Sequence, residues 1–172
     1  KDDLSPVTEA DSESHKILKS GLLSLKPTVP VVSEEDFNAV PQQPYWLIDP
    51  LDGTKEFING FEDYTVNIAL IDGNRPTLGL VHLPSTGVTY FGDATGAWKY
   101  VNGKSQKIKV SSIGLEPRVV KSRSHIDGKT QGFINNLRSP KVIAAGSSLK
   151  FCLVAEGQAD IYPRFGRTME WD

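Results

Sequence analysis

The residues with the clearest capacity for chemistry lie between positions 49 and 54, where the sequence reads DPLDGT. Two carboxylates, Asp49 and Asp52, stand three residues apart, and a Gly-Thr step follows them. Carboxylate oxygens are the ligands that hard divalent cations prefer, and the N–H groups at the start of a helix bind phosphate. The segment therefore predicts a metal ion and a phosphate side by side, which favours metal-assisted phosphoryl chemistry.

Two secondary-structure elements must hold this acidic segment in place. The apolar residues 45–48 predict a buried strand that ends at the first carboxylate. Residues 55–58 predict a helix that begins directly after the Gly-Thr step. We therefore expect a strand, an acidic turn that contains Pro50, and a helix N-terminus in direct succession.

A site for two metal ions needs carboxylates from more than one strand end, because a single turn cannot surround two ions. Glu34 is the candidate from a neighbouring strand, since it follows the short strand predicted at residues 29–32. Taken alone, Glu34 is more often a solvated loop residue. The backbone carbonyl of Leu51 offers a further ligand between the two aspartates.

The first portion of the chain predicts one long helix followed by a sheet. Asp11 is expected as the N-cap of that helix, whose apolar face consists of Ile17, Leu18, Leu22 and Leu25. Further strands, separated by Gly- and Asn-containing turns, are expected at residues 64–72, 77–83, 88–91 and 97–101. This spacing predicts a meandering antiparallel sheet.

After Gly114 strands and helices alternate, with elements expected at residues 119–120, 128–137, 141–145, 147–156 and 160–162. The whole pattern predicts an α/β fold. We expect an α+β metal-binding portion over residues 1–114, an incomplete α/β portion on the substrate side over residues 115–172, and the site in the cleft between them. Both ends of the sequence look interrupted, so flanking elements are expected to be missing.

Composition and charge narrow the range of partners. The 172 residues are 38% hydrophobic and 23% charged, with a formal net charge of −2, which argues against a nucleic-acid polymer or a membrane surface as a partner. No apolar run reaches the roughly 18 residues of a membrane span. The one cysteine, Cys152, lies among apolar residues and is expected to be a buried hydrophobe in a protein of the reducing cytoplasm.

The acidic segment resembles the signature of the inositol monophosphatase superfamily, the lithium-sensitive, Mg²⁺-dependent phosphatases. Three further segments support the resemblance. Residues 33–35 resemble the Glu-Glu motif of that superfamily, Trp171-Asp172 resembles its Trp-Asp motif, and residues 5–11 resemble the N-terminal segment whose aspartate helps to order water. The resemblance implies the layered αβαβα sugar-phosphatase fold.

A narrower resemblance points to one branch of that superfamily. Residues 55–57, 122–125, 146–150 and 162–164 look like those of the CysQ-type 3′(2′),5′-bisphosphate nucleotidases, whereas inositol monophosphatases typically have Thr-Asn in place of Lys55-Glu56. The implied substrate is 3′-phosphoadenosine 5′-phosphate (PAP), hydrolysed to AMP and phosphate. Its sulfated precursor PAPS is a second candidate, which would link the protein to sulfate assimilation.

The resemblance also implies roles for individual residues. Two or three Mg²⁺ ions would be held by Glu34, Asp49, the Leu51 carbonyl, Asp52 and Asp172. The implied catalytic residues are Thr54, Asp11, Glu34 and Asp49, with Thr54 hydrogen-bonded to Asp11 and orienting the attacking water. The implied substrate-binding residues are Gly53, Thr54, Lys55, Ser124, His125, Gly146, Ser147, Lys150 and Arg164.

The residues themselves agree with a bisphosphorylated substrate, which needs a second anion site away from the metal ions. Lys150, Arg164 and Arg123 are the available cations, and the turn at residues 146–148 adds N–H donors. For Arg123, His125 and Arg167 a role at the solvent-exposed surface is at least as well supported.

Two alternatives stay open. The first is an inositol- or fructose-phosphate phosphatase of the same superfamily. The second is a catalytically silent metal- or nucleotide-binding module. The sequence does not fix the number of metal ions, the lithium sensitivity or the oligomeric state.

Overall fold

Two β-sheets organise the fold, which is a computed structural model that describes residues 7–39, 41–124 and 127–171. In chain order the elements are α1 (Glu9–Leu25), β1 (Val31–Ser33), the 3₁₀ helix η1 (Glu34–Asp36), β2 (Tyr45–Asp52), α2 (Thr54–Ile58), β3 (Thr65–Asp72), β4 (Arg75–Leu83), β5 (Val88–Asp93), β6 (Gly96–Val101), β7 (Lys104–Lys107), β8 (Arg118–Ser122), α3 (Gly128–Asn135), β9 (Lys141–Ala145) and α4 (Leu149–Ala155).

The larger sheet contains strands β1 to β7 in chain order. β1 and β2 are parallel, and every later neighbour is antiparallel, as the predicted meander requires. The turn between β3 and β4 places Gly73 at φ 61° and Asn74 at φ 62°. Glycine and asparagine tolerate this left-handed conformation, which is why they mark the hairpin.

The smaller sheet pairs β8 with β9 in parallel, and α3 forms the crossover between them. The strand expected at residues 160–162 is reduced to a single parallel bridge between Ile161 and Val119. α4 packs on both sheets, because Cys152 contacts the cluster around Leu83 and Tyr90 while Leu153 contacts the cluster around Val120.

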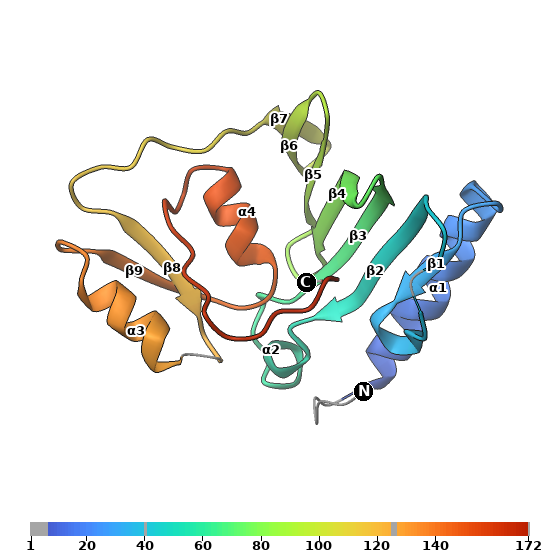
Figure 1. The fold of residues 1–172 in the computed structure, drawn as a ribbon, viewed down its shortest axis with the longest axis horizontal. Coiled ribbons are helices and arrows are strands. Elements are labelled where there is room, and N and C mark those ends of the chain that lie inside the picture. Colours follow the sequence, from blue (N-terminus) through green and yellow to red (C-terminus); the bar gives the residue numbers. More distant parts are fainter. Residues whose placement is uncertain (1–6, 40, 125–126, 172) are drawn as a thin grey trace.

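The resulting layers are α1, the large sheet, α4, the β8–β9 pair and α3, in that order across the molecule (Figure 1). This arrangement confirms the predicted α/β class and the αβαβα layering. The boundary at residue 114 between two portions stays a prediction. None of the helices in the described part of the chain is long and apolar enough to cross a membrane.

α1 covers β1 and β2, and Leu22 packs against Trp46 and Ile48. The predicted N-cap is wrong. Thr8 is the N-cap and Asp11 lies in the first turn, where its Oδ2 accepts hydrogen bonds from the Thr8 N–H (2.8 Å) and hydroxyl (2.6 Å). Asp11 is thus the third residue of the helix and bonds back to the N-cap residue, as in a capping box.

The predicted apolar face of α1 is also too wide. Ile17 is 70% exposed and Leu25 is 75% exposed, whereas Leu22 is buried and Leu18 packs against it. Neither Ile17 nor Leu25 belongs to the apolar cluster that α1 forms with β2.

The acidic segment differs from the expected turn. β2 continues through Asp49 to Asp52, and the register against β3 shifts between these two residues, with Asp49 opposite Asn67 and Asp52 opposite Thr65. Pro50 lies inside this irregularity and has no N–H to donate to a neighbouring strand. The segment is therefore a β-bulge, which re-aims side chains at a strand end.

Candidate active site

The register of β1 on β2 brings Glu34 next to the acidic segment. Ser33, the last residue of β1, pairs with Ile48 in the parallel ladder. Glu34 begins η1 directly after Ser33, and Asp49 directly follows Ile48 in β2. Neighbouring strands lie about 4.8 Å apart. This placement supports the prediction that two carboxylates from distant parts of the sequence meet here.

Asp49 is almost completely buried, with 1% of its surface exposed, and its Oδ1 accepts a hydrogen bond from the Leu51 N–H at 3.0 Å. A carboxylate held by the backbone of its own bulge has a fixed orientation. The bulge thus turns Asp49 and the Leu51 peptide into one rigid unit.

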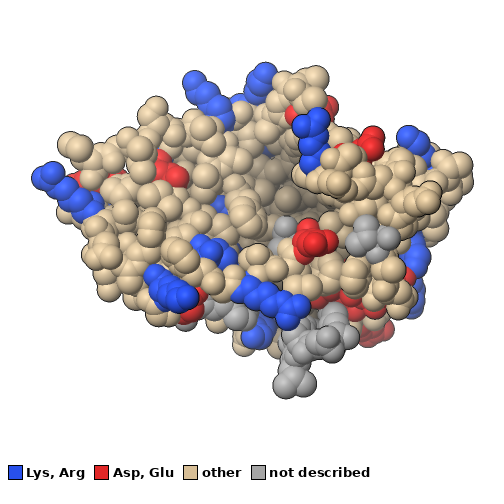
Figure 2. Space-filling model, viewed as in Figure 1, with Lys and Arg blue, Asp and Glu red and all other residues tan. Residues whose placement is uncertain are grey.

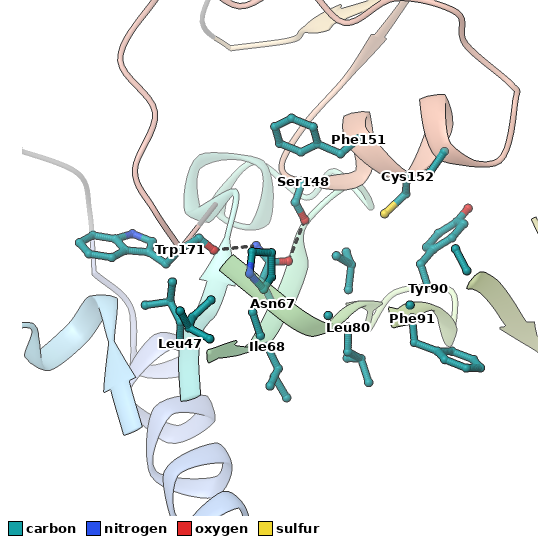
Figure 3. A pocket seen from close by; sticks show the side chains of 18 of the residues that line it. Leu47, Asn67, Ile68, Leu80, Tyr90, Phe91, Ser148, Phe151, Cys152 and Trp171 are labelled. Atoms are coloured by element: carbon teal, nitrogen blue, oxygen red, sulfur yellow. Dashed lines mark hydrogen bonds between the residues drawn. The ribbon is translucent and has the colours of Figure 1, made fainter. Parts of the chain in front are cut away.

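Asp52 points toward α4 instead. Its Oδ2 accepts hydrogen bonds from the Ser148 N–H, the Thr65 hydroxyl (3.4 Å) and the Asn67 amide (3.5 Å). The Ser148 hydroxyl also contacts the Asn67 Oδ1 at 2.7 Å, a bond that is visible in Figure 3. A buried polar network therefore fastens the second aspartate to the start of α4.

Thr54 joins three segments of the chain. Its hydroxyl lies 3.3 Å from the Asp11 Oδ1 and 3.2 Å from the Leu51 carbonyl oxygen, while Ser14 of α1 donates to the Pro50 carbonyl at 2.8 Å. The predicted hydrogen bond between Thr54 and Asp11 is therefore present. The catalytic roles of both residues stay predictions.

The chemistry of the donors fits a hard cation, since carboxylate and carbonyl oxygens are its usual ligands. Among the described residues, however, no three His, Cys, Asp or Glu side chains form a group that could hold a metal ion. Asp172, the last ligand in the predicted set, lies outside the described residues. The bulge alone therefore supplies only part of a coordination shell, and the full ligand set stays a prediction.

The turn at residues 146–148 lies against the start of α2. A Cβ atom at Gly53 would lie 3.3 Å from the Ser147 Cβ, and Gly53 itself adopts φ 88°, a conformation that favours glycine. The predicted phosphate-binding residues Gly53 and Thr54 and the predicted substrate residues Gly146 and Ser147 are thus brought together.

Lys150 is buried rather than solvent-exposed, with 6% of its surface accessible. Its Nζ donates to the Ser147 carbonyl and lies 5.4 Å from the centre of the Tyr162 ring. Burial lowers the pKa of Lys150, and the nearby carboxylates of Asp52 and Glu56 oppose that shift. The ammonium group therefore stabilises the turn that precedes α4, a helix that begins at Leu149 and not at the predicted residue 147.

The other predicted substrate residues have different surroundings. Ser124 donates to the Glu56 Oε1 at 2.5 Å, and Arg164 donates from Nη2 to the Arg167 carbonyl at 2.7 Å while its buried Nε lacks a hydrogen-bond partner in the described structure. Lys55 is an exposed residue of α2. His125 lies outside the described residues.

Three buried polar residues around the site were not predicted to take part in it: Glu56, Asp63 and Asn67. The sequence marks Glu56 only as part of the branch-specific motif at residues 55–57. No local pattern marks Asp63 or Asn67 as buried, because acidic and amide residues are most often exposed. Their roles follow from partners that are far away in the sequence.

A cavity of about 400 Å³ adjoins the site between β2–β5, α4 and the segment that contains Trp171. Figure 2 shows it as a hollow in the surface, and Figure 3 shows Ile68, Leu80 and Phe151 along its walls. Asn67 and Ser148 also line it, whereas Asp49 and Asp52 do not. The mostly apolar cavity therefore lies next to the acidic bulge. Asn67 and Ser148, which line the cavity, also donate hydrogen bonds to Asp52 of the bulge.

Comparison with known proteins gives a consistent result. The model of the inositol monophosphatase family matches residues 1–172. The chain is 49% identical to the 3′(2′),5′-bisphosphate nucleotidase CysQ of Salmonella typhimurium and 50% identical to that of Escherichia coli, in each case over 100% of this chain and 71% of the relative. The crystal structure of CysQ from Bacteroides thetaiotaomicron superposes with a TM-score of 0.87 at 36% identity, covering 99% of this chain and 71% of that one.

Proposed function

Because this chain belongs to the inositol monophosphatase family, we propose that it hydrolyses the 3′-phosphate of PAP to give AMP and phosphate. The identity of about half of all residues to bisphosphate nucleotidases, over the whole chain, carries this proposal. PAPS is proposed as a second substrate, and sulfate assimilation in the cytoplasm as the setting. The Lys55-Glu56 pair supports the nucleotidase branch over the inositol phosphatases.

We propose that Mg²⁺ binds to the Asp49 and Asp52 carboxylates and the Leu51 carbonyl, with Glu34 and Asp172 completing the set. When bound, the ion lowers the pKa of water and neutralises charge on the departing oxygen. The pairing of Ser33 with Ile48, the residues that precede Glu34 and Asp49, supports this ligand set.

Thr54 is proposed to orient the attacking water. Its hydroxyl can accept a hydrogen bond from that water while it donates its own proton to the Asp11 Oδ1, 3.3 Å away. This relay fixes the direction of the water's lone pair and gives its proton a path toward a buried carboxylate. The N–H groups of Gly53 and Thr54 would hold the phosphoryl oxygens.

The second phosphate of the substrate is proposed to bind on the side of α4. Ser147, Lys150 and Arg164 lie there, and the buried Nε of Arg164, which lacks a partner among the described residues, supports an anion at this place. Burial of Lys150 strengthens its electrostatic effect on a nearby anion, because the surrounding dielectric constant is low.

The test is phosphate release from PAP, PAPS, inositol 1-phosphate and fructose 1,6-bisphosphate in the presence of Mg²⁺, with AMP identified by chromatography. We expect PAP to be the preferred substrate, EDTA to abolish turnover and Mg²⁺ to restore it. Turnover of the inositol or fructose ester without PAP would move the assignment to that branch. Binding of PAP without any phosphate release would favour a silent binding module.

Lithium offers a second criterion for the same site. We expect millimolar Li⁺ to slow phosphate release by replacing one Mg²⁺ and trapping the product phosphate. A rate that does not respond to Li⁺ would count against the proposed arrangement of ions.

A further inference from the structure

Two acidic side chains next to the site, Glu56 and Asp63, are buried although neither is a predicted metal ligand. Glu56 is 4% exposed and Asp63 is 8% exposed. Removing a carboxylate from water costs several kcal/mol unless it is paired and hydrogen-bonded. Their positions therefore call for an explanation in terms of their partners.

The partners of Asp63 come from the smaller sheet. Its Oδ2 accepts hydrogen bonds from the Gly146 N–H at 2.6 Å and from Arg123 at 2.8 Å and 3.2 Å. The Arg123 guanidinium also stacks on the Phe61 ring, 4.7 Å from its centre. One carboxylate thus joins the loop after α2 to the residues that follow both β8 and β9.

Glu56 makes a parallel connection from α2 itself. Its Oε1 accepts the hydrogen bond from the Ser124 hydroxyl. Its Cγ and the Asp63 carbonyl oxygen leave no space at Gly146, where an added Cβ would lie 2.5 Å and 2.7 Å from them. The Gly146 backbone is therefore pressed directly against the two acidic residues.

We propose that Glu56 and Asp63 are positioning residues. They hold Ser124 and the Gly146–Ser147 turn close enough to the start of α2 for these segments to bind one substrate molecule together. The proposal rests on the proposed function, because it assigns these contacts to the affinity for the nucleotide. The carboxylates also favour the charged form of buried Lys150, opposing the effect of burial on its pKa.

Asp63→Asn is the first variant, since it keeps the shape of the side chain but removes the charge that pairs with Arg123. We expect the KM for PAP to rise about tenfold, which corresponds to about 1.4 kcal/mol, while kcat stays within about threefold. Arg123→Lys, which keeps the charge but loses the two-pronged contact, should act in the same direction with a smaller effect.

Asp160→Asn is the matched control. Asp160 likewise accepts a backbone N–H, from Arg118 at 2.7 Å, together with the Arg118 guanidinium at 2.6 Å and 3.1 Å, but it is not among the residues of the site. We expect it to lower thermal stability and to leave the KM unchanged. An equal rise in KM in both variants would show that only stability is lost, and would overturn the proposal.

Hydrogen exchange of the Gly146 amide provides a readout that does not depend on turnover. We expect Asp63→Asn to speed this exchange at least tenfold relative to the wild-type protein, and Asp160→Asn to leave it unchanged. If the wild-type protein fails to hydrolyse PAP, the proposed function falls while the exchange still decides the positioning role. Unchanged Gly146 protection, or an unchanged KM in an enzyme that does hydrolyse PAP, would overturn the inference.

Discussion

Asp49 is the residue on which the metal assignment depends most directly. Asp49→Asn keeps the volume and can still accept the Leu51 N–H, so the fold should survive. Phosphate release should fall at least by the roughly 10–100-fold that even outer-shell changes at metal sites cost. Circular dichroism and thermal unfolding would verify the fold, and turnover close to that of the wild-type protein would contradict the metal assignment.

Substitutions at Thr54 can distinguish the role of its hydroxyl group from the role of its packing. Thr54→Val keeps the shape but removes the group that contacts Asp11 and Leu51, and we expect kcat to fall by about 10²–10⁴-fold, as for the loss of a general acid–base group. Thr54→Ser should recover most of the rate because it restores the hydroxyl. Equal rates for the Val and Ser variants would mean that the hydroxyl does not orient the water.

Cys152 illustrates a residue whose character the sequence predicts well. The side chain is buried, and burial raises the pKa of its thiol to about 12. Apolar neighbours along the chain are enough to predict this outcome, since a thiol behaves as a small hydrophobe in such surroundings. A thiolate nucleophile at this position is not supported.

At the scale of elements, α4 is fastened to the large sheet by Glu156 at its end. Its two oxygens accept hydrogen bonds from the Tyr90 hydroxyl and the Lys99 ammonium, each at 2.8 Å. Burial, reinforced by the bond to Glu156, raises the pKa of Tyr90.

Glu156→Ala should therefore lower the free energy of unfolding by about 1–3 kcal/mol, because it leaves polar groups of β5 and β6 without their partner. Urea denaturation would measure the change. Glu156→Gln should be the milder variant, since it keeps an acceptor for Tyr90. A free energy unchanged in Glu156→Ala would show that water replaces these contacts at no cost.

The sequence predicts the elements better than their ends. The strands of the meander are confirmed because hairpin turns and apolar alternation are local signals. The predicted start of α1 is wrong because Thr8 and Asp11 are both good capping residues. Only the three-dimensional contact between them decides which one is the N-cap. Residues 160–162 form only the single bridge from Ile161 to Val119 in place of the predicted strand. No local pattern encodes how many strand pairs a segment makes.

The acidic segment marks the limit of prediction for the site. Its residue types predict oxygen ligands, and the argument that strand ends converge is supported by the pairing of β1 with β2. The bulge was missed, because it arises from how β2 pairs with β3. Glu56 and Asp63 were missed as positioning residues for the same reason, since their partners are 60 to 83 positions away.

At the scale of the whole molecule, Asp160 links stability to pH. The Arg118 guanidinium, together with Ser111, holds the pKa of the Asp160 carboxyl well below its ordinary value of about 4. A lowered pKa in the folded state means that the stabilisation is complete above about pH 4 and is lost as the pH falls toward the folded-state pKa.

Asp160→Asn should therefore reduce the Tm near neutral pH, and its difference from the wild-type protein should shrink below about pH 4. Thermal unfolding measured across this range provides the test, with Asp93→Asn as a comparison, because the pKa of Asp93 is lowered only by local bonds to residues 95 and 96. A Tm difference that stays constant down to about pH 2 would contradict the linkage.

The large sheet ends at β7, which among the described strands pairs only with β6. All four of its residues are exposed, and the strand begins and ends with lysine. Lys107 also lies over the Trp98 ring, 5.7 Å from its centre. A strand from a second molecule that added to this edge would have to remove water from the two lysine ammonium groups, so β7 disfavours aggregation at this edge of the sheet.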